Sequence, residues 1–118
     1  MEIRLTVNNE QKTWQAAPGE NLRDLLRREG YLSVKYGCDS GTCGVCTVLF
    51  DGRAVHSCTI IAAQANGHRI TTVEGLGDQS RLDPLQEAFV EAGAIQCGYC
   101  TPGMLLATKS LIAENPAP

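Results

Sequence analysis

Long apolar runs are absent from this 118-residue sequence: the longest, at residues 60–63 and 104–107, are four residues each. A helix that crosses a membrane needs ~20 apolar residues, so we expect no membrane span. Basic runs are also absent, and the formal net charge is −3. Nucleic-acid binding therefore has no electrostatic support. Residues 1–6 show neither the basic region nor the apolar core of an export signal, so we expect a protein that is not exported.

Side chains for bond-making chemistry are equally scarce. The histidines are His56 and His68 alone, and we expect both to be surface or packing residues. No Ser/His/Asp set and no pair of carboxylates indicates catalysis. Residues 75–77 lack the third glycine and the βαβ setting of a nucleotide-binding loop, so we expect a linker there. The sequence thus predicts no substrate chemistry on this chain.

Cysteine, by contrast, is plentiful, with six residues in the chain. Four of them follow the spacing Cys38-x4-Cys43-x2-Cys46-x11-Cys58. This is the ligand pattern of a plant-type [2Fe–2S] cluster, in which four thiolates bind two irons. Gly37, Gly41 and Gly44 lie among these cysteines. We expect them to reach positive φ, to let the backbone approach closely and to point N–H groups at sulfur. We interpret the loop as an electron-transfer site.

Two other interpretations of these cysteines are weaker. Disulfides are typical of small secreted domains, and no export signal is present. A structural zinc site normally has two C-x2-C pairs, which the four-residue gap between Cys38 and Cys43 fits poorly. Because six cysteines without an export signal indicate a reducing compartment, we expect a cytoplasmic protein.

The first half of the chain has the pattern of a small strand-rich domain. Strands are predicted over residues 3–7, 12–16, 47–50, 53–57 and 69–73. Asn21 is expected to cap a short helix that Gly30 ends. Asp51-Gly52 is a strong hairpin signal, and this hairpin would return Cys58 toward the cysteine loop. We predict an N-terminal β-grasp domain, of the plant-type ferredoxin kind, over residues 1–75.

Residues 76–118 are predicted to be helical, which makes the fold class α+β. Asp83, Pro84 and Gln86 form an expected capping box. Leu85, Ala88, Phe89 and Ala92 then share one helix face, which ends at Gly93. A second helix is predicted to start with Thr101 as its cap and to end before residue 115. Two helices with wide apolar faces need further helices, or a partner, to cover them.

A second cysteine pair, Cys97-x2-Cys100, lies just before this last helix. A helix N-terminus lowers thiol pKa values and suits a thiolate ligand. The pair alone is compatible with a redox dithiol, half a zinc site or half an iron–sulfur site. Because it follows a ferredoxin-like domain, we favour half of a second cluster.

Three segments of the sequence carry a specific resemblance. They are Lys35-Tyr36-Gly37-Cys38 through Cys46-Thr47-Val48, His56-Ser57-Cys58, and Ala94-Ile95-Gln96-Cys97-Gly98-Tyr99-Cys100-Thr101-Pro102-Gly103-Met104. With them the whole chain resembles the small iron–sulfur subunit of the molybdenum hydroxylases, the family of xanthine dehydrogenase, aldehyde oxidoreductase and carbon monoxide dehydrogenase.

The resemblance implies two [2Fe–2S] clusters in two domains, the second a partial four-helix bundle. The cluster held by Cys38, Cys43, Cys46 and Cys58 would lie nearer a flavin, and the cluster of Cys97 and Cys100 nearer a molybdopterin. Gln96 would contact the pterin. The implied partners are a molybdopterin-binding large subunit and an FAD-binding medium subunit, within a multi-subunit oxidoreductase.

One departure from the family pattern concerns the second cluster. The family completes this site with a Cys-x-Cys motif further along the chain, and the present sequence ends at residue 118 without one. A missing tail, a second chain that supplies ligands, and an empty site all remain open. We favour a missing tail, and hence a C-terminally truncated domain over residues 76–118. The helices that such a tail would add would also cover the uncovered apolar helix faces.

We predict an electron-transfer subunit that relays single electrons from a molybdopterin centre toward a flavin or an external acceptor. Two alternatives belong to other classes. One is a self-standing ferredoxin-type carrier, against which the apolar helical half argues. The other is a zinc-stapled interaction module, which would be colourless where iron–sulfur protein is red-brown.

Overall fold

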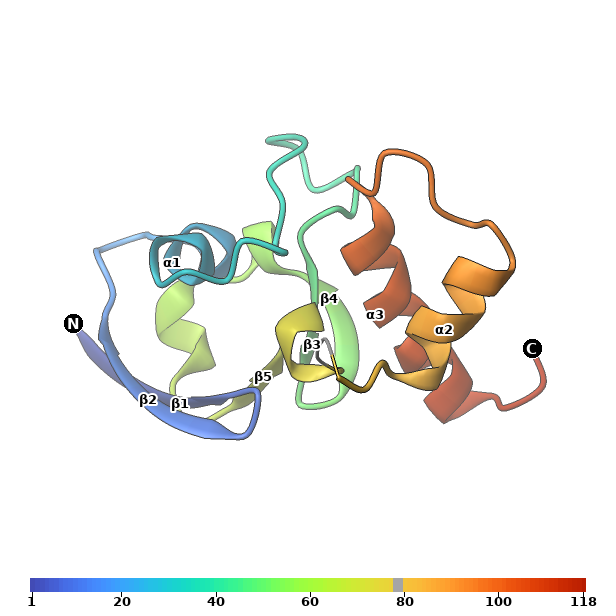
Figure 1. Cartoon of the computed structure of the whole chain (residues 1–118). Helices are drawn as coiled ribbons and strands as arrows, with labels where there is room; N and C mark the ends of the chain where they lie inside the picture. Colours follow the sequence, from blue (N-terminus) through green and yellow to red (C-terminus); the bar gives the residue numbers. More distant parts are fainter. Residues whose placement is uncertain (78–79) are drawn as a thin grey trace.

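A mixed five-stranded sheet forms the body of the computed structural model, which describes residues 1–77 and 80–118. The strand order is β2-β1-β5-β3-β4, with β1 parallel to β5 and the other neighbours antiparallel (Figure 1). This confirms the predicted β-grasp arrangement. The strands are β1 Glu2–Val7, β2 Glu10–Gln15, β3 Thr47–Phe50, β4 Arg53–His56 and β5 Arg69–Thr71.

Both hairpins turn between strands that the sequence predicts. Asn8 and Asn9 join β1 to β2 with φ values of 51° and 68°, and Asp51 and Gly52 join β3 to β4 with φ values of 50° and 86°. Two consecutive residues with positive φ make the type of turn whose twist matches that of the strands. The second turn matters for function, because it brings the chain back to Cys58.

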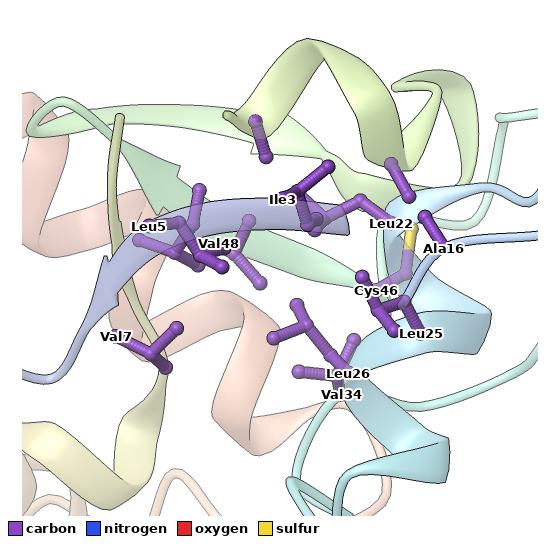
Figure 2. Packing of buried hydrophobic residues seen from close by; sticks show 13 residues of the cluster. Ile3, Leu5, Val7, Ala16, Leu22, Leu25, Leu26, Val34, Cys46 and Val48 are labelled. Atoms are coloured by element: carbon purple, nitrogen blue, oxygen red, sulfur yellow. The ribbon is translucent and has the colours of Figure 1, made fainter. Parts of the chain in front are cut away.

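Helix α1 (Leu22–Arg28) covers one face of the sheet. The Asn21 side chain accepts a hydrogen bond from the Asp24 amide at 2.9 Å, which confirms the predicted cap. Figure 2 shows the apolar side chains of α1 facing those of β1. The buried core that they form comprises Ile3, Leu5, Val7, Ala16, Leu22, Leu25, Leu26, Val34, Cys46, Val48, Ala62, Ala65 and Ile70.

The helical half contains α2 (Pro84–Glu91) and α3 (Thr101–Glu114). The capping box of α2 is confirmed: Leu85 N–H donates to the Asp83 carboxylate and Asp83 N–H donates to the Gln86 side chain. The predicted Thr101 cap is wrong. Thr101 is the first helical residue, because Cys100 already has helical φ and ψ values of −84° and −10° and takes the cap position. An N-cap side chain needs extended backbone to reach the free amides.

Helix α3 packs against the sheet, beside β3 and β4 (Figure 1). Leu105 and Leu106 are buried in this contact, and the Ser110 hydroxyl accepts a hydrogen bond from the Ala54 amide of β4 at 3.1 Å. Helix α2 is less well covered, since Leu85 and Phe89 are half-buried and none of its residues is buried. The described part of the chain thus leaves the predicted apolar face of α2 largely open. Its helices are all too short or too polar to cross a membrane.

An ion pair between Asp83 and Lys109 holds α2 against α3. Burial alone would raise the pKa of Asp83, but hydrogen bonds from Lys109 and from the Leu85 amide outweigh it and lower that pKa below its ordinary value. A carboxyl group with a depressed pKa stabilises the fold above its unfolded-state pKa of about 3.9 and loses this contribution as the pH falls through the lower folded value.

We therefore expect hydrogen-exchange protection of residues 84–91 to fall as the pH drops below about 4. Protection factors corrected for intrinsic exchange measure this. The variant Lys109→Met should show weaker protection at neutral pH and a smaller loss on acidification. An equal acid loss in both proteins would contradict a role for this ion pair.

Candidate iron–sulfur sites

The four cysteines predicted as ligands meet at one end of the sheet. Pairing of Thr47 with His56 across β3 and β4 places the residues just outside the hairpin, Cys46 and Ser57, next to each other. The Ser57 hydroxyl, itself buried, donates to the Cys46 carbonyl at 2.7 Å. Cys58 follows in the short 3₁₀ turn η1 (Ser57–Thr59). The hairpin therefore delivers the fourth cysteine to the loop that carries the other three.

Backbone amides of the loop point at the sulfur of Cys38. The Cys43 amide lies 3.5 Å from Cys38 Sγ. Together with the amides of Ser40 and Thr42, it lowers the pKa of the Cys38 thiol to about 5. A thiol that is already largely ionised at neutral pH is ready to bind metal. The predicted N–H groups directed at sulfur are thus present.

The loop glycines act in two different ways. Gly41 and Gly44 have φ values of 72° and 74°, as predicted. Gly37 does not have positive φ, so that part of the prediction is wrong. Its role is spatial, because a Cβ there would lie 3.0 Å from Cys43 Sγ and 2.7 Å from a methyl group of Val45. The loop folds too tightly at this point for a side chain.

The other two cysteines, Cys46 and Cys58, form a closely coupled pair. Cys46 is 3% exposed and belongs to the hydrophobic core. Burial, followed by the neighbouring Cys46 thiol, raises the pKa of the Cys58 thiol. Metal would take the place of the thiol protons, since metal binding releases them.

The donor set fits a binuclear cluster. In the described residues, no three Cys, His, Asp or Glu side chains gather closely enough to hold one metal ion. A [2Fe–2S] cluster does not require three protein ligands around one ion, because each iron binds two of the four terminal thiolates. The Cys43 amide contacts the Cys38 sulfur, and the Cys46 and Cys38 thiols both contribute to the raised pKa of the Cys58 thiol.

Arg23 is a site residue that the sequence did not reveal. Its side chain is 5% exposed, and its guanidinium donates to the Cys38 carbonyl at 3.1 Å and to Asp24 at 2.9 Å. The guanidinium also lies 3.8 Å from the ring centroid of Tyr36. One signal was available, because Arg23 stands three residues before the buried Leu26 and thus beside the apolar face of α1.

The second cysteine pair lies at the opposite side of the loop, before α3. Cys97 and Cys100 are both exposed. Gln96, also exposed, lines one pocket together with them and with Gly93. The structure thus brings the three predicted residues of the second site together at an open surface.

The two cysteine segments contact each other directly. The Tyr99 hydroxyl donates to the Tyr36 carbonyl, two residues before Cys38. The ammonium of Lys35 lies 5.6 Å from the Tyr99 ring centroid. Cys43 and Cys100 line a common pocket. The two predicted cluster sites are therefore neighbours within one packed structure.

We expect Tyr99→Phe to loosen this contact without unfolding the chain. Loss of one hydrogen bond to a backbone carbonyl costs about 1 kcal/mol, so hydrogen exchange of residues 97–100 should speed up about fivefold. Tyr31→Phe is a suitable control, because the Tyr31 ring packs on Trp14. Equal exchange in both variants would show that the Tyr99 hydroxyl does not hold the second segment.

The two histidines have the packing and surface roles predicted for them. Nδ1 of His56 lies 2.8 Å from the Gly41 carbonyl, so this ring supports the cysteine loop. His68 pairs with Asp51 at the hairpin turn, at 2.6 Å. The His56 ring also lines the pocket that Cys43 and Cys100 share.

Comparison with known proteins identifies the chain. Residues 5–72 match the family described as 2Fe-2S iron-sulfur cluster binding domain, and residues 72–118 match that described as [2Fe-2S] binding domain. The nicotinate dehydrogenase small FeS subunit of Eubacterium barkeri is 47% identical over 117 residues, covering 98% of this chain and 74% of that protein. The xanthine dehydrogenase iron-sulfur-binding subunit of Escherichia coli O157:H7 is 46% identical over 112 residues, covering 95% of this chain and 70% of that protein.

This chain belongs to the family of small iron–sulfur subunits of molybdenum hydroxylases. Solved structures agree. Quinoline 2-oxidoreductase from Pseudomonas putida 86 superimposes with a TM-score of 0.96 at 44% identity, over 100% of this chain and 74% of that one. The aldehyde oxidoreductase of Desulfovibrio desulfuricans ATCC 27774 superimposes with a TM-score of 0.93 at 43% identity, over 99% of this chain and 13% of that one.

Membership of the family of molybdenum hydroxylase small subunits confirms several predictions. Both cofactor sites are of the [2Fe–2S] class, and the chain is part of an oxidoreductase complex with partner subunits. The zinc-stapled module is not supported. The two family matches meet at residue 72, and the division into residues 1–75 and 76–118 stays a prediction.

Proposed function

We propose that Cys38, Cys43, Cys46 and Cys58 hold one [2Fe–2S] cluster. The observation that carries this proposal is the meeting of all four at the β3–β4 end of the sheet, with loop amides aimed at the Cys38 sulfur. A bound [2Fe–2S] cluster accepts and donates one electron at a time. The chain's own part is to fix the four thiolates, to supply hydrogen bonds to sulfur and to keep water from Cys46.

We further propose that Cys97 and Cys100 supply half the ligands of a second cluster. Support comes from their position before α3, where free amides favour thiolates, and from the Tyr99 contact to the first loop. The six cysteines of this sequence supply no further thiolate for that cluster, so its other two ligands would come from outside this set. Gln96 lies in the same pocket and is proposed to contact a pterin.

The chain is proposed to relay electrons from a molybdopterin-binding large subunit, through its two sites, toward an FAD-binding medium subunit. Relatives named for nicotinate, xanthine and nicotine share 46–48% identity with it, so an N-heterocycle oxidised on the large subunit is the proposed substrate class. The proposed compartment is the cytoplasm, where free thiols persist.

Anaerobic mixing of the complete complex with xanthine, nicotinate or benzaldehyde tests the relay. The compound that the complex oxidises should bleach the visible iron–sulfur absorbance before any acceptor is added. Oxidation of a compound with the iron–sulfur absorbance unchanged would contradict the proposed function. A monomeric chain on gel filtration of the native protein would instead favour the self-standing ferredoxin-type carrier.

A further inference from the structure

A buried positive charge lies beside the four-cysteine loop. The Arg23 side chain, 5% exposed, lines a pocket beside the loop together with Cys58, Asp39 and Ser40. Removing a guanidinium from water is costly unless its partners compensate. The groups that contact the Arg23 guanidinium therefore show which residues its charge stabilises.

Those partners neutralise Arg23 only in part. Among the described residues Arg23 forms an ion pair with Asp24, at 2.9 Å, and 47% of the Asp24 side chain is exposed, so water screens that charge. The other contacts are the Cys38 carbonyl at 3.1 Å and the face of the Tyr36 ring. The Tyr36 hydroxyl donates in turn to Asp39, which fixes the ring on which the guanidinium stacks. The guanidinium is thus a buried cation held by three contacts.

This cation lies beside the cysteine ligands. Arg23 and Cys58 line the same pocket. Through the hydrogen bond to the Cys38 carbonyl, the same side chain also fixes the first ligand of the loop. Charges interact more strongly in a protein interior than in water, so Arg23 has more influence here than a surface arginine would.

We propose that Arg23 is a positioning residue that raises the reduction potential of the four-cysteine site. The inference rests on the proposed function, namely that these cysteines hold a [2Fe–2S] cluster. Reduction moves one electron from a donor, which is oxidised, to the cluster, which gains one negative charge. A fixed cation beside Cys58 stabilises that added charge and shifts the equilibrium toward the reduced form.

Redox titration of the complete complex tests the proposal, with the first cluster followed by its electron paramagnetic resonance signal. Arg23→Met removes the charge and keeps an apolar stem of similar reach. At a fixed potential the ratio of reduced to oxidised cluster should fall about tenfold, which for one electron is a shift of ~59 mV. Arg23→Lys, which keeps the charge, should recover most of that loss.

A matched control lies one turn further along the same helix. Arg27 also donates to backbone carbonyls, those of Leu32 and Val34, and neither residue belongs to the cysteine loop. Arg27→Met should therefore leave the ratio unchanged. An equal fall in Arg27→Met and Arg23→Met would overturn the proposal, because it would point to a general effect of disturbing α1.

A second variant decides the matter if Arg23→Met does not retain iron. Asp24→Asn removes the partly exposed partner and leaves Arg23 less neutralised, so the reduced fraction should rise. An unchanged ratio in Asp24→Asn, or an Arg23→Met protein with full iron and an unchanged ratio, would overturn the proposal. Iron and sulfide content distinguish this failure from that of the proposed function, which predicts a cluster whatever its potential.

Discussion

Cys43→Ala should cost the chain about two irons and two sulfides and leave the fold intact. Cys43 is the exposed member of the four-cysteine group, so its side chain contributes little to the core. Alanine offers no ligand, and the cluster would lack one of its four terminal thiolates. We expect substrate to reduce the partner's molybdenum in this variant, and reoxidation by the electron acceptor to stop.

Iron analysis, circular dichroism and stopped-flow absorbance measure the three parts of this expectation. Thr42→Ala is the control, since Thr42 is an exposed neighbour whose hydroxyl bonds only to Ser40 among the described groups. Cys46→Ala should differ from both, because Cys46 is 3% exposed within the core and its loss should also destabilise the fold. Normal turnover with acceptor in Cys43→Ala would refute the relay role of this site.

Gly103→Ala should separate α3 from the cysteine loop. An added Cβ would lie 2.7 Å from the Gly44 carbonyl oxygen, a backbone atom that cannot rotate away. Overpacking of this kind costs about 1–3 kcal/mol. This cost exceeds the stabilisation of about 1 kcal/mol that replacing glycine by alanine gives inside a helix. We expect a lower melting temperature and faster hydrogen exchange across residues 101–107.

Thr108→Ala is the matched control for that variant. Thr108 is on the same helix, and within the part of the chain that the structure describes its hydroxyl donates only to the Met104 carbonyl of α3. Alanine there should leave the melting temperature unchanged or raise it, because alanine is the better helix former. If Gly103→Ala also raised the melting temperature, the close approach of α3 to Gly44 would not be a feature of the folded protein in solution.

Local signals in the sequence predicted the elements around the four-cysteine loop, and the ligand set itself stays a prediction. The ligand spacing, the Asp51-Gly52 turn and the Asn21 cap each depend on a few neighbouring residues, and the structure shows the turn and the cap as expected. Gly37 shows the limit of such signals. Its small size is needed, but the reason is the close approach of Cys43 and Val45 rather than positive φ.

The missed features depend on contacts between distant segments. No motif of the sequence pointed to Arg23, and arginine is mostly solvated in proteins. Its burial follows from the loop at residues 36–39 folding over α1, which no local pattern encodes. The docking of α3 on β3 and β4 was missed for a similar reason. An apolar helix face shows how much surface must be buried, but it does not show which element of the fold packs against it.

The central claim is that this chain holds iron–sulfur clusters on its cysteines, and the most direct test is elemental. Iron, acid-labile sulfide and zinc should be counted per chain in the complete complex, purified without oxygen. We predict iron and sulfide in equal amounts, about four of each with both sites filled, and no zinc. One zinc per chain without sulfide would contradict the account.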